Sequence, residues 1–120
     1  MPCPETPNCI CSQSEKTHQS YVEPIITQYC SEPSQLMAIV KKCILQYKRT
    51  KIIQETNNYF WVECRTLLGW TDDLEIYFKA KEGILHIRSS SRTGYYDFRK
   101  NQYRYLALKK AILNTIKKGW

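Results

Sequence analysis

The chain has 120 residues, of which 42% are hydrophobic and 24% are charged, so its length and composition indicate one folded domain and exclude a disordered chain. Its 18 lysines and arginines outnumber its 11 aspartates and glutamates, which gives a formal charge of +7. That charge favours an anionic partner such as nucleic acid, phosphate or a membrane surface, while no apolar run approaches the roughly 18 residues of a membrane-spanning helix.

Residues 1–30 contain four of the five prolines and show no sustained hydrophobic period. We therefore expect an irregular N-terminal arm that belongs to the same domain as the rest of the chain. The arm can include a short edge strand near residues 21–26, where Pro24 restricts a strand to an edge. The first residues lack the charged and apolar regions of a signal peptide, so the sequence predicts a cytoplasmic protein, or an exported one if a leader precedes Met1.

Six cysteines are present, and two of them, Cys43 and Cys64, lie within apolar patterns that predict small core residues. Cys3 and Cys9 would form a disulfide if the compartment is oxidising. The arm also contains four residues of the types that bind zinc, but their spacing does not match common zinc modules, so no metal site is predicted. These four residues are Cys3, Cys9, Cys11 and His18.

Residues 31–120 are predicted to form an α-β-β-β-β-α core. The first helix spans residues 32–47, because Ser31 is a suitable N-cap and the apolar residues after it follow helical spacing. The last helix spans about residues 101–117 and has an apolar stripe along one side. Its lysines are interpreted as a solvated face, and they are Lys109, Lys110, Lys117 and Lys118.

Four strands are predicted between the helices, over residues 51–56, 59–66, 73–79 and 84–90. Asn57-Asn58 supplies the turn of the first hairpin. Apolar and polar residues alternate along the strands, which is typical of a sheet with one buried face. The expected fold class is therefore α+β, with a four-stranded antiparallel sheet and two helices packed on one face.

The alternation also predicts the register of the last two strands. Ile76 opposite Ile87, with Glu75 opposite Arg88, keeps the apolar residues on the face that the helices cover. The other face is expected to be open to water or to a protein partner. It carries aromatic residues and charges of both signs, namely Tyr59, Trp61, Glu63, Arg65, Asp73, Glu75, Tyr77, His86 and Arg88.

The densest group of polar residues, residues 88–97, follows the last strand and precedes the last helix. Its hydroxyls and two guanidiniums suit an anion such as phosphate or carboxylate. The alternative is a structural role, in which the arginines pair with carboxylates of the sheet. The expected pairs are then Arg88 with Glu75, and Arg92 with Asp72 or Asp73.

Three segments resemble those of a known, mainly bacterial family. Residues 3–13 (CPETPNCICSQ) resemble its CPxSPNCVSSQ opening, and residues 72–76 (DDLEI) resemble its DDVEF segment. Residues 88–97 (RSSSRTGYYD), continuing to Asn101 and Arg104, resemble its RSASRxGYSD…NRxR segment. The chain is therefore similar, over nearly its whole length, to the domain-of-unknown-function family number 1499.

The resemblance implies no established activity, but it does imply which residues are signature positions. They are Gly94 and the candidate ligand-binding residues, namely Asp73, Glu75, Arg88, Ser89, Ser91, Arg92, Tyr95, Asp97, Asn101 and Arg104. Most of them already stand out as the polar group described above. The resemblance also makes a Cys3–Cys9 disulfide natural in an exported member of the family.

The favoured hypothesis is a small non-enzymatic binding or accessory domain, whose signature residues hold the fold or accept an anionic ligand. The chain contains no dinucleotide-binding glycine motif, P-loop or HExxH motif, so no cofactor is expected and an enzyme is not favoured. A hydrolase is one alternative. It would use Asp73 or Glu75 as base and Arg88 with Arg92 as anion clamp.

The second alternative is a nucleic-acid-binding module. Aromatic residues on the open sheet face can stack bases, and the basic helices can contact phosphates. Glu63, Asp73 and Glu75 share this face, however, and would repel phosphates, so nucleic acid is the less favoured partner.

Overall fold

The computed structural model describes residues 9–16, 20–27, 33–66, 69–92 and 100–117. Two helices and six strands lie within these ranges. In chain order they are β1 (Cys9–Cys11), β2 (Ile25–Ile26), α1 (Pro33–Leu45), β3 (Thr50–Glu55), β4 (Tyr59–Arg65), β5 (Thr71–Lys79), β6 (Ile84–Ser91) and α2 (Lys100–Lys117).

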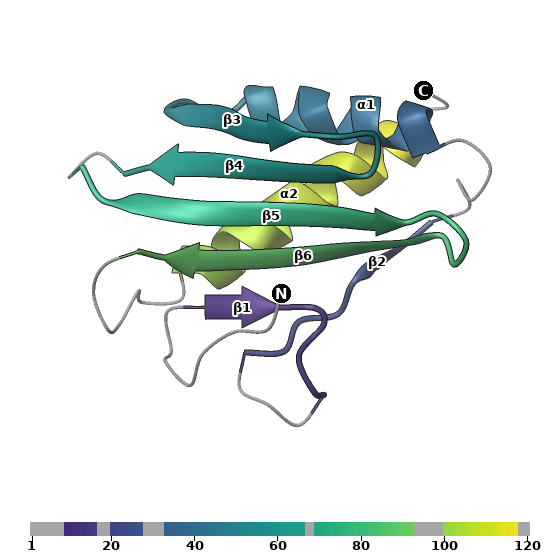
Figure 1. Cartoon of the computed structure of the whole chain (residues 1–120), viewed down its shortest axis with the longest axis horizontal. Coiled ribbons are helices and arrows are strands. Elements are labelled where there is room, and N and C mark those ends of the chain that lie inside the picture. The colour runs from purple at the N-terminus through teal and green to yellow at the C-terminus, as the bar shows by residue number, and fades with distance from the viewer. Residues whose placement is uncertain (1–8, 17–19, 28–32, 67–68, 93–99, 118–120) are drawn as a thin grey trace.

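All six strands belong to one sheet, in the order β1-β6-β5-β4-β3, and β2 pairs separately with β6 (Figure 1). Every one of these strand pairs is antiparallel. The predicted α+β class, the two helices and the four central strands are thus confirmed. The prediction of a four-stranded sheet was wrong, because the N-terminal arm adds two strands that are only three and two residues long.

The register of the central hairpin is the predicted one. Ile76 lies opposite Ile87 and Glu75 lies opposite Arg88. Both strands run longer than predicted, since β5 begins at Thr71 and β6 continues to Ser91. Buried and half-buried residues alternate along β5 without interruption, as expected for a strand with one covered face.

Both helices lie on the same side of the sheet, behind it in the view of Figure 1. The core between the two layers is formed by residues that alternate along the strands and by one stripe of each helix. Its fully buried members include Leu36 and Ile39 of α1, Phe60 of β4, Phe78 of β5 and Leu108 of α2. Cys43 and Cys64 are buried in the same core, as predicted.

The helix α1 ends at Leu45, two residues earlier than predicted. Thr50 supplies a hydrogen-bond donor to this end of the chain, since its Oγ1 donates to the carbonyl oxygen of Tyr47, just past the helix, at 3.0 Å and lies 3.5 Å from that of Ile44 in the last turn. The chain then reverses through Arg49, whose φ is 62°. Tyr47, which falls within the predicted helix of residues 32–47, lies past the end of α1 and is 41% exposed.

The N-terminal arm is attached to the end of the sheet by backbone and side-chain contacts. Ser12 accepts a hydrogen bond from the Ile87 amide at 2.8 Å, and its own amide donates to the Ile87 carbonyl at 2.9 Å. The Tyr105 hydroxyl of α2 donates to the Glu23 carbonyl, so the arm is also fixed to the helix layer. Cys9 is disulfide-bonded, and its predicted partner Cys3 lies outside the described residues.

Within the described residues, no helix is long and apolar enough to cross a membrane. The predicted N-cap Ser31 and the zinc-ligand candidate His18 lie outside those residues.

Candidate functional site

The signature residues do not form one group. Because side chains alternate along a strand, neighbours in sequence point to opposite faces of the sheet. Ser89 and Asp72 face the helices and are completely buried, whereas Asp73, Glu75 and Arg88 lie on the open face and are partly exposed. Among the signature residues that the structure describes, two clusters thus lie back to back on the sheet in place of a single polar cluster.

The inner cluster lies between the sheet and the first turns of α2, and we define it as Asp72, Ser89, Lys100, Asn101 and Arg104. Arg104 Nη2 donates to Asp72 Oδ2 at 2.6 Å, and its Nη1 donates to Asn101 Oδ1 at 2.8 Å and to Ser89 Oγ at 3.2 Å. Ser89 Oγ donates to Asn101 Oδ1 at 2.6 Å. A fully buried carboxylate is costly unless it is paired and hydrogen-bonded, and this network supplies both.

Lys100 gives the inner cluster a second cation, since its Nζ lies 3.1 Å from Asp72. The same Nζ lies 5.7 Å from the centroid of the Trp70 ring, a distance that allows a cation–π interaction. Two cations thus face one carboxylate, so the inner cluster carries a formal charge of +1. Asn101 also donates to Ser91 Oγ at 3.2 Å, which joins this last signature serine to the cluster.

The outer cluster lies on the open face, and we define it as Glu63, Asp73, Glu75, Arg88 and Arg92. Arg92 binds Asp73 through two nitrogens, with Nε to Oδ2 at 2.9 Å and Nη2 to Oδ1 at 2.8 Å. Its Nη2 also donates to Glu63 at 2.5 Å. Arg88 Nη1 donates to Glu75 Oε1 at 2.7 Å. The structural pairing of Arg88 with Glu75, and of Arg92 with Asp73, is confirmed.

Two aromatic residues of β4 complete the outer cluster. Trp61 Nε1 donates to Asp73 Oδ1 at 2.9 Å, and the Tyr59 hydroxyl donates to Glu75 Oε2 at 2.8 Å. Burial, together with this bond to Glu75, raises the pKa of Tyr59 to about 12, so the hydroxyl stays protonated as a donor. Asp73 and Glu75 therefore each accept from one arginine and one aromatic side chain, whereas Glu63 accepts from Arg92.

The electrostatics of the outer cluster bear on its chemistry. The hydrogen bonds from Arg92, more than that from Trp61, hold the pKa of Asp73 below its usual range, although burial acts in the opposite direction. A carboxylate with a lowered pKa is a poor general base at neutral pH. The guanidinium of Arg92 is likewise already engaged by Asp73 and Glu63, which leaves it poorly suited to clamp a further anion.

His86 lies beside this cluster on β6, opposite Tyr77 as expected from the register. Its Nδ1 lies 2.9 Å from Ser12 Oγ of the arm. Burial, and secondarily the charge of Lys79, lower the pKa of His86. The ring is thus kept neutral in a role that fixes the arm to the sheet.

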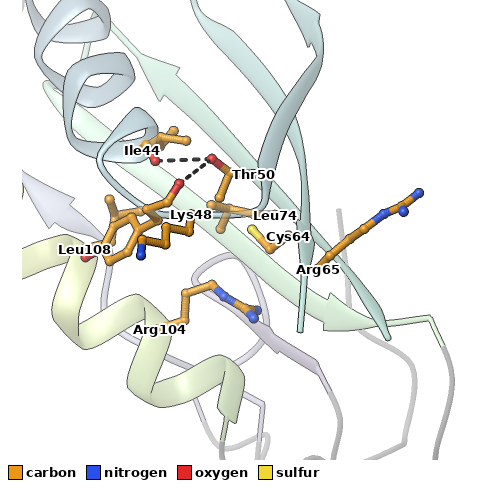
Figure 2. Close-up of a pocket in the computed structure, with 9 residues that line it drawn as sticks. Ile44, Lys48, Thr50, Cys64, Arg65, Leu74, Arg104 and Leu108 are labelled. Atoms are coloured by element: carbon orange, nitrogen blue, oxygen red, sulfur yellow. Dashed lines mark hydrogen bonds between the residues drawn. The ribbon is translucent and has the colours of Figure 1, made fainter. Parts of the chain in front are cut away.

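A pocket of about 140 Å³ opens on the helix side, next to the inner cluster (Figure 2). It is lined by the end of α1 and the turn that follows, by β3, β4 and β5, and by α2. The lining residues are Ile44, Tyr47, Lys48, Thr50, Cys64, Arg65, Leu74, Arg104 and Leu108. Three of them are cationic and none is acidic.

Arg104 connects the pocket to the inner cluster, because its side chain extends from α2 toward the sheet beneath Cys64, while Arg65 points away from the interior (Figure 2). Cys64 is a free thiol, and burial raises its pKa. The floor of the pocket is therefore apolar and uncharged. Its positive groups are Arg104 inside and Lys48 and Arg65 toward the solvent.

Several sequence-based candidates fall outside this description. Gly94, Tyr95 and Asp97 lie outside the described residues. Conversely, sequence reasoning did not place Asp72 or Lys100 among the site residues. The adjacent pair Asp72-Asp73 was a usable signal. Two neighbouring carboxylates on a strand face opposite sides of the sheet, so one of them faces the core and requires a cationic partner there.

One comparison with known proteins found a match. The model of the family described as "Protein of unknown function (DUF1499)" matches residues 1–112 of the chain. Among curated proteins and among solved structures, the comparisons found no match.

Proposed function

Because the chain belongs to the family of proteins of unknown function DUF1499, its function has to be argued from its own residues, and we propose that it is a small non-enzymatic binding domain for an anionic ligand with an apolar body. The proposed binding site is the pocket beside Arg104. The hypothesis that signature residues accept an anion is thereby kept for the inner cluster, on the helix side of the sheet. It is not kept for the outer cluster, which contains Arg88 and Arg92.

The observation that carries this proposal is the composition of the pocket wall. Ile44, Leu74 and Leu108 provide apolar contact, while the charged side chains among the described lining residues are those of Lys48, Arg65 and Arg104. An anion placed there meets no opposing carboxylate within this described part of the wall. The buried Asp72 behind Arg104 is outweighed by its two cationic partners, so the pocket keeps a positive potential.

The size of the pocket limits the ligand. Its volume of about 140 Å³ is close to the roughly 150 Å³ of a protein cavity that holds benzene. A ligand body of one aromatic ring or a short aliphatic chain therefore fits, with a carboxylate, sulfonate or phosphate directed toward the cations. Arginine and lysine both bind such groups through charge-assisted hydrogen bonds.

The alternatives receive less support. A hydrolase that uses Asp73 as base is disfavoured by the arginine and tryptophan bonds that lower its pKa. Base stacking on Tyr59 and Trp61 is disfavoured because both side chains donate to carboxylates, which leaves negative groups where a phosphate backbone would have to pass.

The test uses 4-fluorobenzoate as an anionic probe and 4-fluorobenzyl alcohol as its neutral counterpart. Binding is measured by ¹⁹F NMR and by amide shifts in the ¹H–¹⁵N spectrum of the full chain. We expect the benzoate to bind at millimolar concentration and to shift the amides of Ile44, Leu74 and Leu108, while the alcohol binds more weakly. Equal binding of the two probes, or benzoate-induced shifts confined to residues outside the pocket, would overturn the proposal.

A charge variant sharpens the test without disturbing the fold. Lys48 is exposed and lines the pocket, so Lys48→Gln should weaken benzoate binding by about two- to fivefold, the effect of losing one solvent-exposed charge interaction. Lys81→Gln, in the exposed turn between β5 and β6, removes the same charge elsewhere and should leave binding unchanged. If both variants weaken binding equally, only the net charge matters and the pocket is not the site.

A further inference from the structure

The outward side of α2 combines exposed apolar residues with unneutralised lysines. A helical spacing of three and four residues places Tyr103, Leu106, Lys110, Leu113 and Lys117 along one line of the helix, and we call them the outer stripe. The buried residues of α2 follow the same spacing on the opposite side, namely Asn101, Tyr105, Leu108 and Ile112. The helix therefore has two apolar stripes, but the core uses only one.

The exposure of the outer stripe is high for its residue types. Tyr103 is 63% exposed, Leu106 is 51% exposed and Leu113 is 39% exposed. Single exposed apolar residues are common on protein surfaces, but these three share one line of the helix with two lysines. Such an arrangement suits contact with a surface that is less polar than water and negatively charged.

The charge of α2 has one sign. None of its 18 residues is acidic, and α1 has no acidic residue either. Lys100 and Arg104 share the carboxylate of Asp72 within the inner cluster. Among the described residues, Lys110 and Lys117 make no salt bridge, so the outer stripe presents net positive charge beside its apolar side chains.

We propose that the outer stripe of α2 docks on the surface of an anionic lipid bilayer. Leucine side chains enter the boundary between headgroups and acyl chains, tyrosine favours that boundary, and lysines extend to the headgroup phosphates. A nucleic acid fits the charge but leaves Leu106 and Leu113 in water. This surface is separate from the pocket, so the proposal stands independently of the ligand proposed above.

The expected binding is weak and reversible, since one short helix face supplies it. Each lysine near an anionic surface contributes about a fivefold increase in partitioning. Removing Lys110 and Lys117 together should therefore reduce binding by roughly 25-fold at low ionic strength. Replacing Leu106 and Leu113 removes the apolar contribution while the charge stays constant.

The test is co-sedimentation of the full chain with large vesicles. Vesicles of equal parts phosphatidylglycerol and phosphatidylcholine should bind the protein, and vesicles of phosphatidylcholine alone should bind little. Lys110→Gln/Lys117→Gln and Leu106→Ser/Leu113→Ser should each lose binding. Lys51→Gln/Lys81→Gln changes the charge equally at exposed positions outside the stripe and should bind like the wild type. Urea unfolding of every variant confirms that the fold is retained.

Three results would overturn the proposal. Equal losses in the stripe variant and in the Lys51/Lys81 control would show that only net charge matters. Unchanged binding in the Leu106→Ser/Leu113→Ser variant would show that the bilayer does not receive the apolar residues. The protein could also bind a 20-base-pair duplex that competes fully with vesicles. If the leucine substitutions leave that binding unchanged, the stripe is a nucleic-acid surface instead.

Discussion

Asp72 and Asp73 are adjacent on β5, yet their carboxylates bind arginines on opposite faces of the sheet: Asp72 binds Arg104 of α2, and Asp73 binds Arg92 on the open face. Asp72 is completely buried, while the side chain of Asp73 is 21% exposed. The same residue type thus occurs twice in succession in two different electrostatic environments, which allows one to serve as the matched control for the other.

The first prediction compares Asp72→Asn with Asp73→Asn. Removing the charge of Asp72 leaves Arg104 and Lys100 uncompensated beside the core, and we expect the free energy of unfolding to fall by about 3 kcal/mol. Asp73→Asn should cost about 1 kcal/mol, because its partner Arg92 is largely exposed. Urea unfolding at pH 7 measures both. Equal losses would contradict the conclusion that the buried Asp72 contributes more to stability than Asp73.

The second prediction concerns the pH dependence of the outer cluster. The folded-state pKa of Asp73 lies below its unfolded value, which is about 3.9, so its contribution to stability is full above that value and is lost as the pH falls through the folded pKa. The stability difference between wild type and Asp73→Asn should therefore be present at about pH 6 and shrink toward zero at strongly acidic pH. A difference that grows on acidification would show that the pKa is raised instead.

The third prediction concerns His86. Its folded-state pKa is lowered, so the unfolded state binds a proton first and His86 reduces stability as the pH falls below about 6.5. Histidine ring NMR should give a titration midpoint for His86 below 6.5. Lys79→Gln should raise that midpoint by removing the neighbouring charge, whereas Lys51→Gln should not. A midpoint at or above the usual value would mean that the ring is solvated.

The fourth prediction tests the attachment of the arm. Tyr105→Phe removes the hydroxyl that donates to the Glu23 carbonyl and should cost about 1 kcal/mol of stability. Amide exchange of Thr27, which pairs with Gly83, should become faster because β2 loses its support. Tyr103→Phe, which changes an exposed tyrosine on the same helix, is the control and should affect neither quantity. Unchanged exchange in Tyr105→Phe would show that the arm is fixed by its sheet pairing alone.

Sequence periodicity predicted β4, β5 and β6 because each has seven or more residues that alternate between the core and the open face, and the Asn57-Asn58 turn predicted the pairing of β3 with β4. The alternation of Leu74, Ile76 and Phe78 predicted which face of β5 is buried, and the four-residue loop before β6 then predicted the register. By contrast, β1 and β2 are too short for any period to appear, and their structure depends on backbone groups that β6 offers from far along the chain. No local sequence pattern in the arm indicates that its partner is β6.

The sequence predicted the ion pairs on the open face of the sheet, but not the separation of the signature residues into an inner and an outer cluster. The pairing of Glu75 with Arg88 follows from strand register, which alternation specifies. The pairing of Asp72 with Arg104 requires knowing where α2 crosses the sheet, and that depends on packing of the whole helix layer. The pocket beside Arg104 is lined by both helices and three strands, so no single segment of sequence contains it.

The pairing of β1 with β6 also affects the order in which parts of the fold can form during synthesis. Ser12 and Ile87 are separated by 75 residues, so at a translation rate of about 5–20 residues per second the arm leaves the ribosome roughly 4–15 s before its partner strand. Closing so long a loop is entropically costly and slow compared with forming the neighbouring hairpins. During synthesis the arm is therefore without its partner strand for several seconds, and β1 can pair only after β6 has been made.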